Sequence, residues 1–168
     1  MDYQLRITYL KNLKEAILKH ETQIKKALYD DLGKSSHESY LTEIGVVLSE
    51  LSLFIKNLKK WMKPIKTKNS LAVFPAKSFL YPESYGKVLI IGPWNYPFQL
   101  IMMPLIGAIA AGNTVVIKPS EYAPQTENIL ITILSEVFTK NEVTIKTGDH
   151  VVSQALLSEK FDYIFFTG

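Results

Sequence analysis

Cysteine is absent from the 168-residue sequence, and histidine is scarce. The absence of cysteine excludes disulfide bonds, thiolate metal ligands and a cysteine nucleophile within these residues. The three histidines, His20, His37 and His150, lie too far apart in the sequence to show the spacing of metal ligands. We therefore predict that the chain holds no metal site.

A strong charge imbalance and a long hydrophobic run are also lacking. The net charge is only +3 and the lysines are spread along the chain, which argues against a nucleic-acid partner. The longest apolar run, residues 98–111, is shorter than the ~20 residues of a membrane-spanning helix. The chain begins directly with an amphipathic pattern instead of a secretory leader, so we expect a cytoplasmic protein.

The most informative stretch covers residues 86–97 and reads Gly-Lys-Val-Leu-Ile-Ile-Gly-Pro-Trp-Asn-Tyr-Pro. Its apolar run, residues 88–91, is typical of a strand buried on both faces, as in a parallel sheet. The Gly-Pro pair that follows ends the strand, and Pro97 suits the first turn of a helix. Residues 94–96 therefore follow the carboxyl end of a parallel strand, where open α/β sheets bind ligands.

The residues before this stretch are predicted to form two helices and a hairpin. Apolar residues recur at helical spacing over residues 3–28 and again over 36–61, where Leu41 and Ile44 belong to the apolar face. We expect Ser36 to cap the second helix and Pro64 to end it. Alternating hydrophobic and polar residues then predict extended pieces over 70–74 and 77–81.

From residue 86 onward, strands and helices alternate. The predicted strands cover residues 87–92, 114–118, 143–146 and 163–166, and the predicted helices cover 98–111, 124–137 and 151–157. This alternation implies a parallel sheet with right-handed crossovers. The predicted fold class is α/β, with a partial Rossmann-like parallel sheet over 86–168, an N-terminal helical pair over 1–63 and a short β-hairpin arm over 64–85.

The fourth strand is expected to have an open edge. In the usual dinucleotide-binding order, this strand lies beside the first one. Its other edge, with the apolar residues 163–166, then has no neighbour, and such edges favour aggregation. We expect marginal stability or self-association unless a complementary chain covers this edge.

Three short motifs together resemble the aldehyde dehydrogenase superfamily. They are Pro93-Trp94-Asn95-Tyr96-Pro97, Lys118-Pro119-Ser120-Glu121 and Phe165-Phe166-Thr167-Gly168. Their spacing and the short loop before Gly86 resemble the class 3 branch, which includes fatty and aromatic aldehyde dehydrogenases. The resemblance covers essentially the whole chain and implies NAD(P)-dependent oxidation of an aldehyde to a carboxylic acid. It also implies that the hairpin helps to form an oligomerisation arm.

Asn95 is the candidate catalytic residue. Its side-chain amide has two N–H donors, which at a strand end can face an oxygen that becomes negative during attack on a carbonyl. The residue type alone leaves a second interpretation, a turn residue whose side chain bonds to nearby backbone. The resemblance implies the first role, with the amide stabilising the oxyanion of a thiohemiacetal. It also implies that Trp94 lies near the cofactor and Tyr96 near the substrate funnel, although simple aromatic packing is an equal alternative for Tyr96.

Lys118 and Glu121 form the candidate cofactor site. An ammonium and a carboxylate just beyond the second strand could share a ribose, or they could form an exposed ion pair of little energetic value. The resemblance implies that both hold the adenosine ribose of NAD or NADP. It assigns cofactor contacts to Ile91, Trp94, Lys118, Ser120, Glu121 and Gly168. The ordinary G-x-G-x-x-G fingerprint is missing, and the resemblance implies a pyrophosphate near the helix that follows the fourth strand, where Gly168 begins the turn.

The resemblance also predicts that the chain is catalytically incomplete. Family members are more than twice as long, and their cysteine nucleophile and glutamate base lie beyond the position of residue 168. We expect no aldehyde oxidation by this chain alone, and a homo-oligomer when complete or a complementing C-terminal fragment as partner. The alternatives are a non-catalytic nucleotide-binding or interaction module that kept the scaffold, and a plain α/β domain with accidental motif matches.

Overall fold

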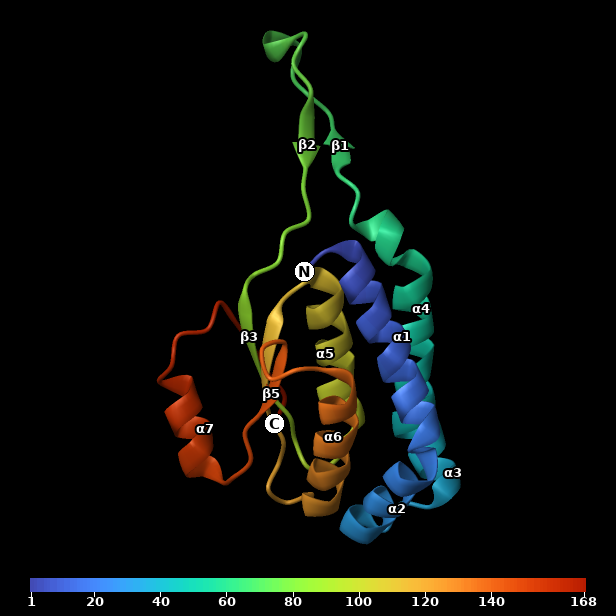
Figure 1. Ribbon diagram of the computed structural model, residues 1–168. Helices are drawn as coiled ribbons and strands as arrows, with labels where there is room; N and C mark the ends of the chain where they lie inside the picture. The colour runs from blue at the N-terminus through green and yellow to red at the C-terminus, as the bar shows by residue number, and fades with distance from the viewer.

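Four parallel strands form the central sheet of the computed structural model, which describes residues 1–168 (Figure 1). The strands are β3 (Lys87–Ile91), β4 (Thr114–Lys118), β5 (Val143–Ile145) and β6 (Tyr163–Phe166), in the order β5-β4-β3-β6. This order confirms the predicted parallel sheet with its fourth strand beside its first. β3 ends one residue earlier than expected, although the Gly92 N–H still donates to the Lys118 carbonyl at 3.1 Å.

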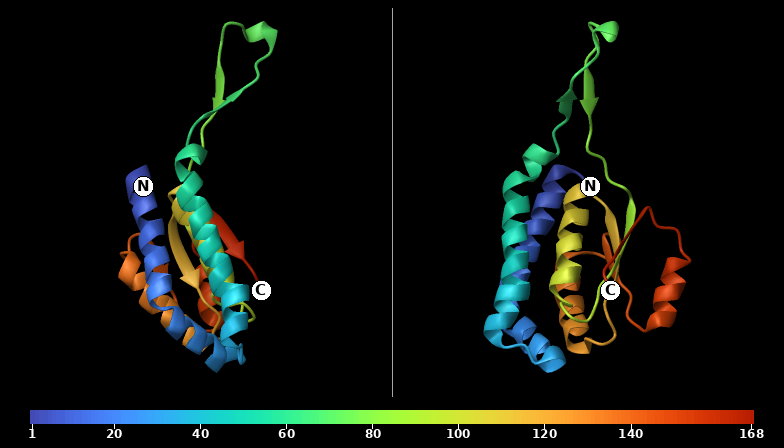
Figure 2. Two further views of the ribbon diagram at one scale, coloured as in Figure 1. Left: turned by 90° about the vertical axis from the view of Figure 1, so that its right-hand side faces the viewer. Right: turned by 180° about the vertical axis from the view of Figure 1, so that it is seen from behind.

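Helices cover both faces of this sheet (Figures 1 and 2). The crossover helices are α5 (Gln99–Ala111), α6 (Pro124–Val137) and α7 (His150–Leu157). Val88 and Ile90 of β3 belong to the large apolar cluster shared with α5 and α6, whereas Leu89 and Ile91 pack in a small cluster with Leu156 of α7. Because neighbouring residues of a strand point to opposite faces, the continuous apolar run fills both layers.

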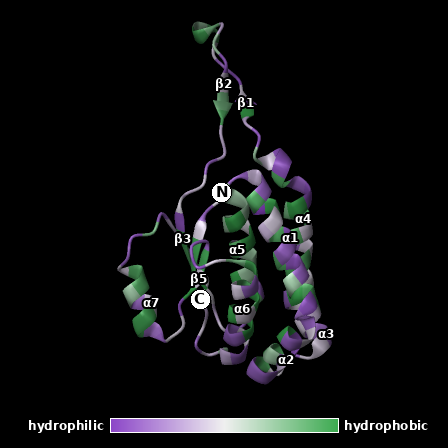
Figure 3. Cartoon of the chain, in the orientation of Figure 1, coloured by the Kyte–Doolittle hydropathy of each residue, from purple (hydrophilic) through white to green (hydrophobic).

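The N-terminal helices form a further layer behind α5 and α6. They are α1 (Tyr3–Lys19), α2 (Glu21–Leu32), α3 (Ser36–Ser39) and α4 (Gly45–Trp61), with a π-helical turn, η1 (Tyr40–Ile44), between α3 and α4. α5 lies between this layer and the sheet. Every residue of α5 after Gln99 is apolar, and Figure 3 shows the helix mostly in green and white. None of the helices combines the length and the apolar character that crossing a bilayer requires.

Three details of the predicted helices are wrong. The expected helix over residues 3–28 is interrupted at His20, so that α1 and α2 are separate helices, and the His20 imidazole lies 3.0 Å from Glu136 of α6. Ser35, not Ser36, is the N-cap, because Ser35 has an extended backbone and its Oγ accepts from the Glu38 N–H. Leu41, expected in the core, is 57% exposed because the π-helical turn shifts the helical register.

The hairpin arm projects away from the helices and the sheet (Figure 2). Its strands are β1 (Ile65–Thr67) and β2 (Ser78–Leu80), which pair antiparallel. The predicted extended piece at 70–74 is wrong, since a 3₁₀ turn, η2 (Leu71–Val73), occupies the tip. Ser70 caps this turn by accepting from the Ala72 N–H, a local bond that the alternating pattern does not reveal.

Candidate active site at the carboxyl edge of the sheet

The predicted site segments meet at one edge of the sheet. Ile91 at the end of β3 is in register with Lys118 of β4 on one side and with Phe166 of β6 on the other. The Thr167 N–H donates to the Ile91 carbonyl at 3.1 Å, so Gly168 also lies beside the end of β3. The structure therefore brings together the three motifs that the sequence separates by up to some seventy positions.

Asn95 lies exposed in the loop between β3 and α5. Its side-chain Oδ1 accepts a hydrogen bond from the Tyr96 N–H at 3.0 Å, which is the bond expected of a turn residue. Its Nδ2 has no hydrogen-bond acceptor within the protein, so both amide N–H groups remain free for another oxygen. The Asn95 side chain can thus stabilise the turn through Oδ1 and donate hydrogen bonds to a ligand through Nδ2.

The aromatic neighbours of Asn95 are open to solvent. Trp94 is 55% exposed and Tyr96 is 38% exposed, and both belong to the same loop. Exposed rings of this kind offer flat apolar surface, here from the residues on either side of Asn95 in the sequence. Ile91, in contrast, is buried in the small cluster that β3 shares with α7.

A buried carboxylate lies beneath this loop. Glu43, on the π-helical turn, is fully buried, and its Oε2 accepts from the N–H groups of Phe98 (2.9 Å) and Gln99 (3.1 Å). These N–H groups begin α5, where no residue of the helix itself provides a side-chain cap. Glu43 therefore caps α5 from a distant part of the chain, and its negative charge suits the helix N-terminus.

Lys34 completes a buried ion pair with Glu43. Its Nζ lies 2.5 Å from Glu43 Oε1, donates to the Asn95 carbonyl oxygen at 2.9 Å and sits 3.9 Å from the centre of the Tyr96 ring. Neither residue was predicted from the sequence to belong to the site. A helical period of 3.6 residues places Glu43 outside the apolar face. Lys34 lies in the short Gly-Lys-Ser-Ser segment between the two predicted helices. No local pattern indicates their pairing, which depends on the π-helical turn.

Lys118 and Glu121 lie close together at the end of β4. Lys118 is buried, and its Nζ donates to Glu121 Oε2 at 2.6 Å, while the Glu121 side chain is partly exposed. This hydrogen bond is the main reason that the pKa of Glu121 is lower than its ordinary value. The alternative of an exposed ion pair is wrong for Lys118. Ser120 is buried, and its Oγ accepts from the Tyr122 N–H at 3.3 Å.

Glu127 adds a third charged group that the sequence did not indicate. It lies on α6, and its Oε2 is buried without a hydrogen-bond partner in the protein. Burial raises the pKa of Glu127, while the positive charge of Lys118 opposes this shift. The cluster thus offers a lysine donor, a partly exposed carboxylate and an unpartnered carboxyl oxygen, a set that suits a ligand with neighbouring hydroxyl groups.

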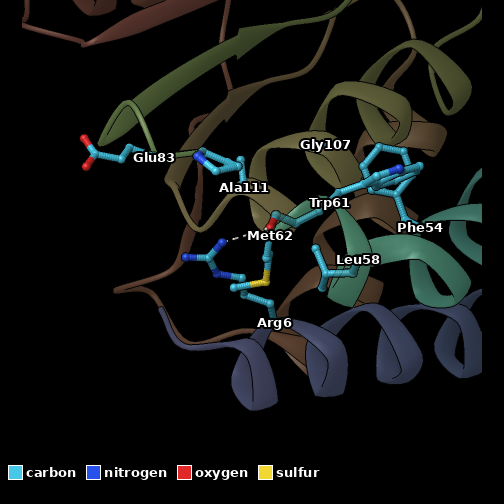
Figure 4. A pocket seen from close by; sticks show the side chains of 10 residues that line it. Arg6, Phe54, Leu58, Trp61, Met62, Glu83, Gly107 and Ala111 are labelled. Atoms are coloured by element: carbon cyan, nitrogen blue, oxygen red, sulfur yellow. Dashed lines mark hydrogen bonds between the residues drawn. The ribbon is translucent and has the colours of Figure 1, made fainter. Parts of the chain in front are cut away.

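A separate cavity of about 240 Å³ lies at the far end of α5, between α1 and α4 (Figure 4). Arg6, Phe54 and Trp61 line it, and Arg6 donates to the Ala110 carbonyl at 3.2 Å. The guanidinium therefore satisfies a carbonyl at the C-terminus of α5. Because Asn95 precedes the N-terminus of the same helix, this cavity is not part of the candidate site.

Comparison with known protein families gives one match over the full length. The model of the aldehyde dehydrogenase family matches residues 1–168. The chain is 46% identical over 167 residues to 4,4'-diaponeurosporen-aldehyde dehydrogenase of Staphylococcus aureus, covering 99% of this chain and 36% of that protein. It is 44% identical over 166 residues to aldehyde dehydrogenase family 3 member H1 of Arabidopsis thaliana, covering 99% of this chain and 34% of that protein.

Solved structures show the same arrangement. The substrate-bound state of Staphylococcus aureus AldH matches with a TM-score of 0.97 at 46% identity, over 99% of this chain and 36% of that chain. The succinic semialdehyde dehydrogenase of Streptococcus pyogenes, solved with NADP+, has a TM-score of 0.83 at 15% identity, over 98% and 36% of the two chains, and supports the fold alone. The chain thus spans 34–36% of the length of the two curated relatives.

Proposed function

Because the chain belongs to the aldehyde dehydrogenase family, we propose that it forms the cofactor-binding part of an NAD(P)-dependent enzyme that oxidises an aldehyde to a carboxylic acid. The observation that carries this proposal is the placement of the free Asn95 amide and the Lys118–Glu121 pair at one edge of the sheet. In this proposal residues 86–168 bind the cofactor, residues 1–63 support them and residues 64–85 form an arm. The catalytic domain belongs to the remainder of the enzyme.

Asn95 is the proposed oxyanion donor. When a thiolate from the remainder of the enzyme attacks the aldehyde carbon, a sulfur–carbon bond forms and the carbonyl π electrons move to oxygen. The Nδ2 N–H groups, which have no acceptor in the protein, then donate to this oxygen. Donors of this kind stabilise the transition state by about 3 kcal/mol in acyl-transfer enzymes.

Lys118 and Glu121 are proposed to orient the adenosine ribose of NAD or NADP. Lys118 can donate to a ribose hydroxyl while Glu121 accepts from one, and the unpartnered oxygen of Glu127 supports a polyhydroxyl ligand here. When bound, the nicotinamide supplies the hydride acceptor for the oxidation. The remaining cofactor contacts are proposed for Ile91, Trp94, Ser120 and Gly168.

The substrate is proposed to be an apolar aldehyde. The exposed side chains of Trp94 and Tyr96, the residues on either side of Asn95 in the sequence, support this proposal. The Staphylococcus aureus relative is named as a dehydrogenase of 4,4'-diaponeurosporen-aldehyde. Octanal and benzaldehyde are therefore suitable first substrates, one aliphatic and one aromatic.

A hybrid enzyme tests the proposal. Residues 1–168 replace the matching segment of the Staphylococcus aureus relative, and aldehyde-dependent reduction of NAD+ and NADP+ is measured. We expect turnover, and Asn95→Ala should lower kcat about 10²–10³-fold because an oxyanion donor is lost. Asn57→Ala, which changes a half-buried asparagine on α4 whose Nδ2 donates to the Leu53 carbonyl, is the matched control and should leave kcat unchanged. Equal turnover by the hybrid enzyme and its Asn95→Ala variant contradicts the proposal.

A further inference from the structure

We propose that the buried Lys34–Glu43 pair is a positioning device that holds the Asn95 amide in place for catalysis. This inference rests on the oxyanion role proposed above for Asn95. Neither Lys34 nor Glu43 reaches the reacting atoms, so both act through the loop between β3 and α5. Every hydrogen bond of the two side chains goes either to the other member of the pair or to the backbone of this loop and the start of α5.

Glu43 fixes the end of the loop. Pro97 has no N–H, and the next two N–H groups, those of Phe98 and Gln99, both donate to Glu43 Oε2. The following N–H, that of Leu100, donates to the Tyr96 carbonyl at 3.0 Å. The N–H groups of Phe98, Gln99 and Leu100 are therefore satisfied, and the loop enters the helix at one defined position.

Lys34 fixes Asn95 itself. Its Nζ donates to the Asn95 carbonyl oxygen at 2.9 Å and contacts the face of the Tyr96 ring. The peptide group between Asn95 and Tyr96 is thus held through its carbonyl by Lys34 and through its N–H by Asn95 Oδ1. With the peptide and Oδ1 both fixed, the position of Nδ2 follows from the side-chain geometry, because the amide is planar.

Helix α6 shows that capping alone does not need the lysine. α6 begins with Pro124, and the next two N–H groups, those of Gln125 and Thr126, donate to the carboxylate of Asp31 at 3.0 and 2.7 Å. No lysine pairs with Asp31 there. At α5 the extra cation is buried at 8% exposure, which is energetically expensive, and its one bond outside the pair goes to Asn95.

The hybrid enzyme tests this role with Glu43→Gln and with the double variant Lys34→Met/Glu43→Gln. The double variant leaves no unpaired buried charge, so it avoids the main cause of misfolding. We expect each to lower kcat about 10–100-fold, with the KM for NAD+ changed by less than about threefold, because a displaced catalytic group loses rate rather than cofactor affinity. In an Asn95→Ala background the same substitutions should lower kcat by less than about threefold, since the positioned group is already gone.

The exposed pair Lys26 and Asp30, 2.6 Å apart on α2, gives the matched control. Lys26→Met/Asp30→Asn removes two charges of the same signs away from the loop and should leave kcat unchanged. If Glu43 has only a structural role, its substitution lowers kcat by the same factor with and without Asn95, and the inference is overturned. Unchanged kcat in both Glu43 variants also overturns it. Unchanged turnover by Asn95→Ala, in contrast, refutes the proposed function.

Amide hydrogen exchange of the 168-residue chain tests the inference without an activity assay. Amide hydrogen exchange of Phe98 and Gln99 should be at least about tenfold faster in Glu43→Gln, since an amide accepts more weakly than a buried carboxylate. The amides in the middle of α6 serve as the internal reference and should keep their protection. Equal protection of Phe98 and Gln99 in both proteins overturns the inference even where the hybrid enzyme has no turnover.

Discussion

Oδ2 of Asp31 accepts two hydrogen bonds from Thr126, one from the backbone N–H at 2.7 Å and one from the hydroxyl group at 2.8 Å. Asp31 lies near the end of α2, and Thr126 lies in the first turn of α6. The N-terminal helices therefore supply the cap that α6 lacks, just as Glu43 does for α5. This arrangement explains why the helices over 1–63 and the βα units over 86–168 form a single packed structure.

Replacement of Asp31 should destabilise the chain. Asp31→Ala leaves two backbone N–H groups and one hydroxyl of α6 without their acceptor, so we expect the free energy of unfolding to fall by about 1–2 kcal/mol. Urea unfolding followed by circular dichroism measures this change. Asp30→Ala is the control, because Asp30 makes only an exposed pair with Lys26 and should change stability by less than about 0.5 kcal/mol. Equal effects of the two substitutions contradict the capping role.

Local sequence patterns predicted the sheet but not the support of the candidate site. The apolar run 88–91 and the Gly-Pro pair after it are short-range features, so strand, turn and helix followed from them directly. The burial of Glu43 depends on a π-helical turn, and a regular helical period instead puts Leu41 in the core, where it is not. The contact of Lys34 with Asn95 joins residues 61 positions apart, and no local propensity encodes it.

Glu127 should influence the choice between NAD and NADP. Its carboxyl group lies in the electrostatic field of Lys118 and Glu121, close to the proposed ribose site. A negative charge there repels a 2′-phosphate, so Glu127→Gln should lower the KM for NADP+ about five- to tenfold and change the KM for NAD+ by less than about twofold. Steady-state kinetics of the hybrid enzyme with both cofactors measures the ratio.

The control for this substitution lies on the same helix. Glu136→Gln removes an equal charge near the other end of α6, where the side chain pairs with Lys19 and His20. It should leave the KM for both cofactors unchanged. A similar change of the NADP+ KM in both variants means that net charge, rather than the position of Glu127, sets the preference.

Glu121 and Glu127 should give stability profiles of opposite sign against pH. The pKa of Glu121 is lowered from 4.5 in the folded chain, chiefly by the hydrogen bond from Lys118. Its contribution to stability is therefore present above 4.5 and is lost as the pH falls through the lower folded pKa. The pKa of Glu127 is raised by burial, so its charge destabilises the chain at neutral pH, and this penalty disappears as the pH falls through the raised pKa.

Matched variants separate the two effects. At neutral pH the chain should be more stable than its Glu121→Gln variant and less stable than its Glu127→Gln variant. Both differences should shrink as the pH falls, that of Glu127 first, because its pKa is the higher one. Urea unfolding at intervals between about pH 3 and pH 7 gives these differences. Differences of the same sign for the two variants contradict the assigned pKa directions.

The hairpin arm should carry subunit contacts in the complete enzyme. Leu71 and Phe74 at its tip are 91% and 81% exposed, which is unusual for large apolar side chains with no partner. Leu71→Ser/Phe74→Ser should shift the hybrid enzyme toward monomer in sedimentation velocity. The same change should alter the unfolding free energy of the 168-residue chain by less than about 0.5 kcal/mol, because neither side chain is buried there.

The open edge of β6 is a second surface through which chains could associate. One further variant distinguishes association through this edge from association through the hairpin arm. Tyr163–Phe166 pair with β3 on one side only and are 37–67% exposed. In the 168-residue chain, self-association through this edge should survive the loss of Leu71 and Phe74 but fall with Ile164→Lys, because an inserted charge opposes strand pairing. Tyr29→Ser, which removes an exposed aromatic ring from α2, should affect neither form of association. If the arm variant abolishes association of the short chain as well, then the arm alone joins the subunits and the edge of β6 does not associate.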